Sequence, residues 1–221
     1  MRIGILGAGN VGGTLGRGWA SKGHEVFFGV PRPQDAKTQD LIRGIGPKAR
    51  AGTVADAAGF ADVVVLATPW QVTEDALKQA GALAGKVVVD CTNPLKADFS
   101  GLVLGYTTSG AEQVARWAKA AKVYKAFNQT GFNNMGAPSL EGRQAVMFVC
   151  GDDAGHKPNV LKLASDLGFE AIDAGGLAIA RLLEPYAMLW IHLAHAQGLG
   201  RDFAFGLLRR NNPSINPAKD K

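Results

Sequence analysis

The stretch Arg2-Ile3-Gly4-Ile5-Leu6-Gly7-Ala8-Gly9-Asn10-Val11-Gly12 decides the fold of this chain. It joins a short apolar run, typical of a buried strand, to a glycine loop that opens a helix. Gly7 permits the tight turn, Gly9 lets a pyrophosphate approach the backbone, and Gly12 lets helix and strand pack closely. The free amides at the start of the helix would face the phosphates. The stretch therefore predicts a dinucleotide-binding loop made by Gly7, Ala8, Gly9, Asn10, Val11 and Gly12.

Short β-branched runs alternate with longer Ala- and Leu-rich amphipathic runs along the rest of the 221 residues. This alternation indicates an α/β fold, a Rossmann-type doubly wound and mostly parallel sheet with C-terminal helices. The expected strands are 2–6, 25–28, 63–67, 87–90, 123–126, 146–150 and 170–173, with a further short one at 49–51. The expected helices are 11–22, 35–43, 72–82, 111–120, 155–167, 177–198 and 202–209.

The end of the second predicted strand indicates which dinucleotide binds. NAD sites usually carry an acidic residue there, whereas this chain has Phe28-Gly29-Val30-Pro31-Arg32-Pro33. The two prolines restrict the backbone on both sides of Arg32, and a guanidinium held in this way suits the 2′-phosphate of NADP. We therefore expect NADP(H), with Arg32 as the phosphate ligand and Lys37 as a second cation. The alternative is that Arg32 is an ordinary solvated loop residue.

Other polar residues follow the carboxyl ends of predicted strands, where ligands of an open parallel sheet bind. These residues lie in the segments Thr68-Pro69-Trp70, Cys91-Thr92-Asn93-Pro94 and Asn128-Gln129-Thr130-Gly131. Thr68 and Asn93 are candidates to hydrogen-bond the nicotinamide ribose or carboxamide, and Pro69 and Trp70 to shield the ring from water. Each has an alternative, because Asn93-Pro94 is a common turn and Trp70 could belong to the core.

These turns contain no His, Asp or Glu, so we assign no catalytic residue. Hydride transfer between a nicotinamide and a second redox ring needs mainly apposition and exclusion of water. Lys125 is the one obvious proton donor, but its position inside a strand-like run favours a structural or solvent-facing role. No metal site is expected, because His192 and His195 lack the HExxH pattern and a nearby third ligand.

Composition limits the partners and the compartment. The formal charge of +5 is carried largely by the C-terminal tail, without a basic run interleaved with aromatics, so we expect no nucleic-acid partner. Residues 177–199 include Arg181 and Glu184, which are costly in hydrocarbon, and so predict a buried or dimer-forming helix and no membrane contact. Cys91 and Cys150 lack CxxC spacing and indicate free buried thiols. With no signal-peptide pattern, we expect a cytoplasmic protein.

With these pieces placed, the chain resembles the coenzyme F420-dependent NADP oxidoreductase family, which also contains the cytosolic domain of the six-transmembrane metalloreductases. The resemblance extends to about Leu208. It is carried by Gly7-Ala8-Gly9-Asn10-Val11-Gly12, Ala67-Thr68-Pro69-Trp70, Asp90-Cys91-Thr92-Asn93-Pro94-Leu95, Lys125-Ala126-Phe127-Asn128, Cys150-Gly151-Asp152-Asp153 and Asp173-Ala174-Gly175-Gly176-Leu177.

The resemblance implies reversible hydride transfer between NADPH and a flavin or deazaflavin, in a small homodimer whose C-terminal helices help to cover the site. It implies that Arg32 binds the 2′-phosphate and that Thr68, Pro69 and Trp70 form a shelf for the nicotinamide. The second ring would lie toward Asn128 and the 175–177 turn. The deazaflavin enzymes carry a histidine where this chain has Asn128, and residues 125–128 are closer to the flavin-using metalloreductase domains. The acceptor is therefore left open among F420, FMN and FAD.

The expected organisation follows. Residues 1–175 form an NADP(H)-binding Rossmann domain, 176–210 a C-terminal helical region that packs on it or on a dimer partner, and 211–221 a disordered tail. The expected partners are a small redox substrate and a second copy of the chain. Two other functions stay open: an NADP-dependent dehydrogenase of a small hydroxy acid or imine, with Lys125 as proton donor, and a non-catalytic NADP(H)-sensing module.

Overall fold

The computed structural model describes residues 1–210, so the tail predicted at 211–221 lies outside the described residues. The strands are β1 (Arg2–Leu6), β2 (Glu25–Gly29), β3 (Ala49–Gly52), β4 (Val63–Leu66), β5 (Val87–Asp90), β6 (Lys122–Lys125), β7 (Ser139–Leu140), β8 (Arg143–Gln144), β9 (Val146–Gly151) and β10 (Glu170–Gly175). The helices are α1 (Asn10–Ser21), α2 (Ala36–Ile45), α3 (Val54–Phe60), α4 (Thr73–Ala80), α5 (Gly110–Trp117), α6 (Phe132–Gly136), α7 (Lys157–Asp166) and α8 (Ala180–Ile191). Three short helical turns are η1 (Trp70–Val72), η2 (Leu177–Ile179) and η3 (His192–Ala196).

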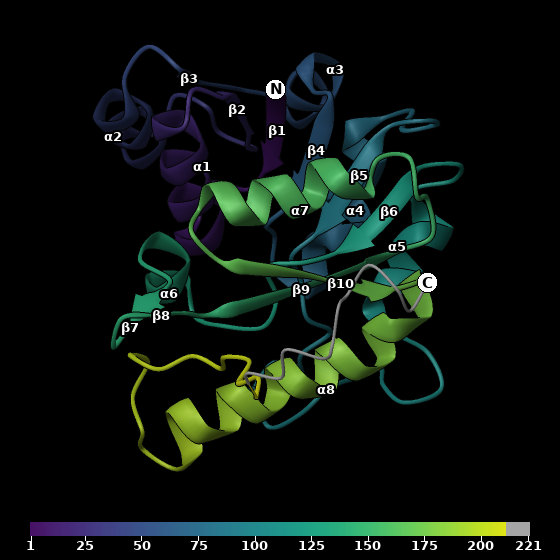
Figure 1. Ribbon diagram of the computed structural model, residues 1–221. Coiled ribbons are helices and arrows are strands. Elements are labelled where there is room, and N and C mark those ends of the chain that lie inside the picture. Colours follow the sequence, from purple (N-terminus) through teal and green to yellow (C-terminus); the bar gives the residue numbers. More distant parts are fainter. Residues whose placement is uncertain (211–221) are drawn as a thin grey trace.

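Eight strands form one sheet in the order β10-β9-β6-β5-β4-β1-β2-β3, and helices cover both of its faces (Figure 1). All neighbouring pairs are parallel except β6 and β9, which are antiparallel. The sequence of the central strands explains this placement, because β4 and β5 are runs of buried apolar side chains that need cover on both faces. The predicted doubly wound, mostly parallel α/β sheet is confirmed.

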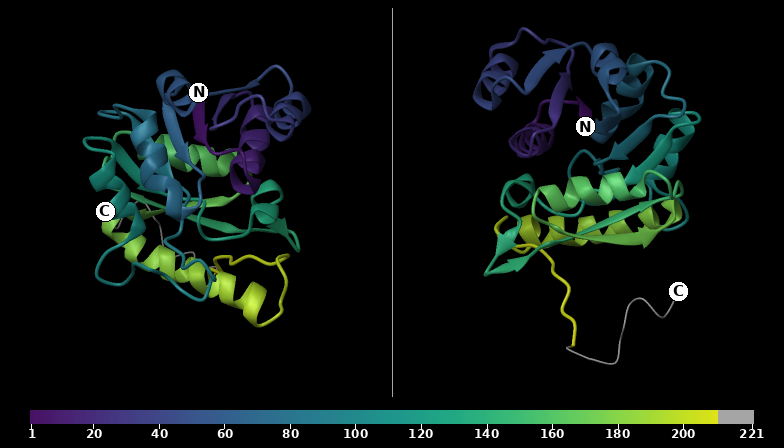
Figure 2. Two further views of the ribbon diagram at one scale, coloured as in Figure 1. Left: turned by 180° about the vertical axis from the view of Figure 1, so that it is seen from behind. Right: turned by 45° about the horizontal axis from the view of Figure 1, so that its top comes forward.

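Two apolar clusters fill the space between the sheet and its helices. One cluster contains Leu15 and Trp19 of α1 and Val160 of α7, and the other contains Leu77 of α4 and Leu183 of α8. The views in Figure 2 show α7 and α8 on opposite sides of the β9–β10 part of the sheet. The candidate residues lie at the edge of the sheet formed by the carboxyl ends of β1, β4 and β5, where Thr68 and Asn93 line a cleft.

Several local predictions differ from the structure. The chain also forms α3, α6 and the small β7–β8 hairpin, which the sequence analysis did not predict. The α8 helix ends at Ile191 and is followed by the π-type turn η3, so regular helix stops short of residue 198. Within the described part, 177–196 is the one helical stretch that is long and apolar enough to cross a bilayer, by length and composition only. Of its most apolar window, 39% is buried inside the protein.

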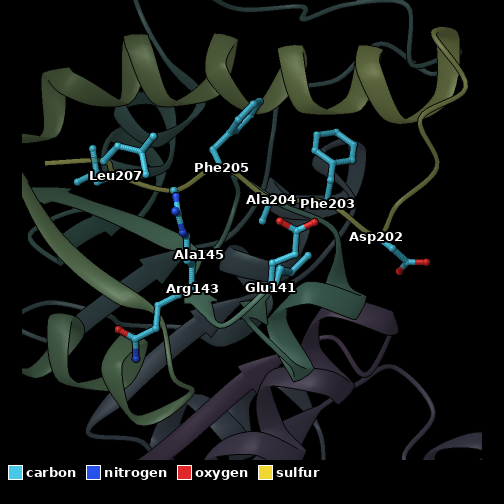
Figure 3. Close-up of a pocket in the computed structure, with 12 residues that line it drawn as sticks. Glu141, Arg143, Ala145, Asp202, Phe203, Ala204, Phe205 and Leu207 are labelled. Carbon is cyan, nitrogen blue, oxygen red and sulfur yellow. The ribbon is translucent and has the colours of Figure 1, made fainter.

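The helix predicted at 202–209 is wrong, because this segment is extended. The rings of Phe203 and Phe205 point toward α8, where they pack on Trp190 at 5.3 Å and Tyr186 at 4.8 Å (Figure 3). Val146 N donates a hydrogen bond of 3.0 Å to Phe205 O, which ties this segment to the start of β9. Two rings that are two residues apart fall on one side of an extended chain but not of a helix, so tertiary packing overrides helix propensity.

This extended segment and the β7–β8 hairpin enclose a cavity of about 560 Å³ (Figure 3). Its walls include Glu141, Arg143 and Asp202 beside the two phenylalanines. The cavity shares no lining residue with the glycine loop or with the ends of β4 and β5. It is therefore separate from the candidate site.

Candidate nucleotide and acceptor site

The three glycines of the loop differ in how much room the fold leaves for a side chain. Gly7 has φ +110°, and a Cβ there would lie 2.6 Å from Ala67 O. At Gly12 a Cβ would lie 2.2 Å from Gly7 O, so the close packing of α1 on the loop excludes any side chain. Gly9 meets nothing within 4 Å, and it precedes α1 without a side-chain cap. The fold thus requires Gly7 and Gly12, whereas Gly9 leaves open space at the start of a helix, where phosphates bind.

Two clefts meet beside this loop. The first, which we call the loop cleft, measures about 400 Å³ and is largely apolar, with Val30, Pro31, Val54 and Ala76 among its walls. The second, the Trp70 cleft, measures about 310 Å³ and lies at the ends of β4 and β5. Both clefts include Thr68 and Pro69 in their linings. The two clefts therefore adjoin at the end of β4, and Gly9 lines the loop cleft.

The predicted nicotinamide residues come together at the Trp70 cleft. Thr68, Pro69, Trp70 and Asn93 all line it. Trp70 is half-buried and packs on Trp117 with ring centroids 5.2 Å apart, so it both belongs to the core and forms a wall of the cleft. The Oγ1 atom of Thr68 lies 2.9 Å from Thr73 Oγ1.

Asn128 does not line this cleft. Its Nδ2 donates to Asn93 Oδ1 at 3.0 Å, and Asn93 Nδ2 donates in return to Asn128 O at 2.8 Å. Asn128 Nδ2 also lies within hydrogen-bond distance of Leu183 O, and Asn128 Oδ1 accepts from Gln129 Nε2. These contacts give Asn128 a structural role in joining the ends of β5 and β6, and its predicted role as a cofactor ligand stays a prediction.

The two predicted phosphate cations differ in their surroundings. Arg32 is in the loop after β2, is 82% exposed, and forms an ion pair of 3.2 Å with Asp35. Lys37 is in the first turn of α2 and lines a further cleft of about 540 Å³ on the other side of the glycine loop. Arg17 of α1 lines the same cleft, as do Ala8 and Asn10. The sequence analysis missed Arg17, although its position two turns into α1 placed it near the loop.

A buried cluster of charges lies beneath the Trp70 cleft. The side chain of Lys125 is 0% exposed, and its Nζ lies 2.7 Å from Asp90 Oδ2 and 2.8 Å from Glu184 Oε1. It also donates to Thr92 O at 2.8 Å. The two oxygens of Glu184 accept from the amides of Gly110 and Ala111 at the start of α5. Asp90 Oδ1 accepts from the amide and hydroxyl of Thr92.

The contacts of this cluster favour a structural role for Lys125. Burial opposes charge on the ammonium group, but the carboxylates of Asp90 and Glu184 outweigh it and raise the pKa of Lys125. A strongly held proton on a group sealed from solvent is unsuited to proton transfer in the cleft. The solvent-facing alternative for Lys125 is wrong, because its side chain is fully buried, and its ion pairs favour the structural alternative. The partners Asp90 and Glu184 were missed, because their pairing depends on α8 crossing the ends of β5 and β6.

The two cysteines are free and buried, as predicted. Burial raises the pKa of Cys91 well above its usual range and that of Cys150 to about 12. Both thiols are therefore protonated at neutral pH, and Cys91, although it lines the Trp70 cleft, is a poor nucleophile. Within residues 1–210 no group of three or more His, Cys, Asp or Glu side chains could hold a metal ion.

Comparison with known proteins places this site in a family. The sequence profile described as "NADP oxidoreductase coenzyme F420-dependent" matches residues 2–94. The F420-dependent NADP reductase of Methanothermobacter marburgensis is 32% identical over 212 residues, covering 87% of this chain and 92% of that protein. The chain belongs to the F420-dependent NADP oxidoreductase family. It is an NADP-dependent oxidoreductase, as its sequence predicts.

Two further relatives agree with this family. The crystal structure of a proposed F420-dependent NADP reductase from Arthrobacter sp. FB24 superposes with a TM-score of 0.85 at 34% identity, covering 95% of this chain and all of that one. The metalloreductase STEAP3 of Rattus norvegicus is 30% identical over 183 residues, which are 83% of this chain. The match spans only 36% of the length of STEAP3. The predicted relation of the family to the metalloreductases is confirmed.

The glycine loop generates a first prediction. Gly9→Ala keeps an allowed backbone, φ −76°, and meets no atom, so the melting temperature should stay unchanged. The methyl group would occupy the space that a pyrophosphate needs, so calorimetry should show NADPH affinity lowered by about tenfold, or about 1.4 kcal/mol. Gly12→Ala is the control for packing, and should lower the free energy of unfolding by about 1–3 kcal/mol. Unchanged NADPH binding in Gly9→Ala would contradict this account of the loop.

The buried cluster generates a second prediction. Lys125→Met leaves two buried carboxylates without their cation, so urea unfolding should show a loss of about 3–5 kcal/mol. Lys78→Met is the matched control, because Lys78 pairs with Glu74 at 3.0 Å on the surface of α4. The free energy of unfolding of Lys78→Met should fall by less than about 0.5 kcal/mol. If Lys125→Met kept full stability and lost only turnover, Lys125 would be a proton donor after all.

Proposed function

We propose that the protein transfers a hydride between NADP(H) and a flavin or deazaflavin ring such as that of F420. The observation that carries the proposal is that the loop cleft and the Trp70 cleft share Thr68 and Pro69. A dinucleotide with its adenosine in the loop cleft and its diphosphate over Gly9 has its nicotinamide at the mouth of the Trp70 cleft. In this proposal the second ring binds in the rest of the Trp70 cleft.

The residues of the Trp70 cleft fit a reaction that depends on apposition. None of its lining side chains is His, Asp or Glu, and its thiol, Cys91, is kept neutral by burial. NADPH supplies a hydride, which carries two electrons, and the acceptor ring takes its second proton from water. The protein's part is then to bind both rings, orient them and exclude water from their contact. Trp70 provides a flat wall, and Thr68 and Asn93 provide polar groups at its edge.

The similarity to F420-dependent NADP reductases supports a deazaflavin as the acceptor. Mixing the protein with NADPH and F420, FMN or FAD in turn tests the proposal. Oxidation of NADPH, followed by its loss of absorbance, is expected with at least one of these rings. No oxidation with any of them, in protein that binds NADPH, would instead favour an NADP(H)-sensing module.

Arg32 should set the preference for NADP(H). In Arg32→Ala, calorimetry should show NADPH affinity reduced by about tenfold while NADH affinity stays the same, because only NADPH carries the 2′-phosphate. Arg43→Ala is a matched control, since Arg43 is an exposed arginine with a similar i,i+3 ion pair, to Asp40. Equal losses for NADPH and NADH would remove Arg32 as the phosphate ligand.

We also propose that α8 forms a homodimer interface. One face of α8 is buried in the chain, whereas Leu182 and Leu189 are 66% and 48% exposed on the other. Apolar side chains exposed together on one helix are typical of a contact with another protein. Light scattering should give a dimer for the native chain and a monomer for Leu182→Asp with Leu189→Asp. A monomeric native chain would contradict the proposal.

The cytoplasmic location of the protein stays a prediction.

A further inference from the structure

The orientation of the Trp70 ring depends on packing. Among residues 1–210, the indole N–H groups of Trp19 and Trp190 each donate to a backbone oxygen, whereas that of Trp70 has no such partner. The ring of Trp70 lies against that of Trp117, the last residue of α5, with an angle of 35° between the two planes. The plane of this wall of the Trp70 cleft is therefore set in part by where α5 lies.

The start of α5 also lies close to Trp70. A Cβ on Gly110, the first residue of the helix, would lie 3.2 Å from Cζ3 of Trp70 and 3.1 Å from Oε1 of Glu184. The backbone of Gly110 therefore fits between the indole and a carboxylate of α8, and even a methyl group there would require one of them to move. Because α5 meets the Trp70 ring near its start and, through Trp117, at its end, a shift of this helix would move the ring.

Two charged side chains of α8 hold the start of α5. The buried carboxylate of Glu184 accepts from the amides of Gly110 and Ala111 at 2.8 and 3.0 Å. Arg181, one turn earlier in α8, donates to the two carboxylate oxygens of Glu112 at 2.9 and 2.6 Å. This bidentate contact lowers the pKa of Glu112, so the pair is fully charged at neutral pH. Two contacts one turn apart fix both the position and the rotation of the first turn of α5 on α8.

We infer that Arg181 and Glu184 are positioning residues for Trp70, and that through α5 they hold its ring in the plane in which it covers the nicotinamide. The inference rests on the proposed function, which puts the nicotinamide beside Trp70. Neither residue lines the Trp70 cleft or the loop cleft, so both act without touching the coenzyme. Arg181 is the better residue to test, because its side chain is 39% exposed, whereas loss of Glu184 would leave buried groups without partners.

The first test uses the unliganded protein and reads the geometry of the rings. Two tryptophan rings packed at a fixed angle couple their electronic transitions and give a paired band in circular dichroism. Loss of this band in Trp117→Phe assigns it to the Trp70–Trp117 pair. Arg181→Met should weaken the band, whereas Arg181→Lys, which keeps the charge, should retain most of it. Arg2→Met is the matched control, because Arg2 pairs with Asp62 at 2.6 Å between two segments at the opposite edge of the sheet.

The second test separates hydride transfer from coenzyme binding. In Arg181→Met the maximal rate of NADPH oxidation, with whichever ring the native protein reduces, should fall by about tenfold, because the reacting rings are misplaced. The dissociation constant for NADPH should stay the same, since no residue of α5 lines the loop cleft that takes the adenosine. Arg2→Met should change neither quantity. A merely structural role for Arg181 would lower the melting temperature and leave both the rate and the paired band as in the native protein.

The outcomes separate the inference from the proposed function. A weakened band and a slower maximal rate in Arg181→Met, with Arg181→Lys close to native in both, support the inference. An unaltered band or an unaltered rate in Arg181→Met overturns it and leaves the proposed function standing.

If the native protein oxidises no NADPH with any ring, the proposed function fails, and the band alone decides the inference. A weakened band then still supports the positioning of Trp70 by α8, and an unaltered band overturns it. Should Arg181→Met fold poorly, Glu112→Gln takes its place in both tests, because it weakens the same contact from the side of α5.

Discussion

One buried ammonium group, that of Lys125, joins the parts of the chain that make the Trp70 cleft. It contacts Asp90 at the end of β5, Glu184 in the middle of α8 and the carbonyl of Thr92. With water excluded, each of these charges depends on its neighbours, so the three segments are held in one relative arrangement. The loop that carries Asn93 follows from this constraint, because Thr92 is bonded on both sides by members of the cluster.

The α8 helix contributes to the site without entering it. Glu184 fixes the start of α5, and the backbone oxygen of Leu183 lies against Asn128. The buried face of α8 is apolar except for Glu184. Packing of this face on the sheet therefore places the Glu184 carboxylate in the interior. The C-terminal region therefore belongs to the architecture of the cleft and is more than a cover for it.

The features that depend on a local sequence pattern were predicted correctly. The glycine loop, the apolar strands and the loop after β2 without an acid all follow from residues that are adjacent in the chain. The α3 helix was missed because it has seven residues, too few for helical periodicity, although the Thr53–Asp56 capping box was a usable signal.

Features that depend on contacts between distant segments could not be predicted in the same way. The extended path of 202–209 is set by ring packing on α8, and the partners of Lys125 are set by how α8 crosses the sheet. Phe99, in the turn between Leu95 and Leu102, has a left-handed backbone, which its residue type disfavours. At Phe99 the residue type favours a negative φ, and at 202–209 the local sequence favoured a helix, so local propensity was misleading at both places.

The contact between Arg32 and Asp35 has a consequence for coenzyme choice. In the proposed role of Arg32, its guanidinium already pairs with the carboxylate of Asp35, so a 2′-phosphate would compete with that carboxylate for the same group. NAD(H), which lacks that phosphate, would leave the ion pair between Arg32 and Asp35 intact and would meet no repulsion there. The preference for NADP(H) over NAD(H) would then equal the difference in free energy between two exposed ion pairs of Arg32, one with the phosphate and one with Asp35. Such a preference is modest and weakens as the salt concentration rises.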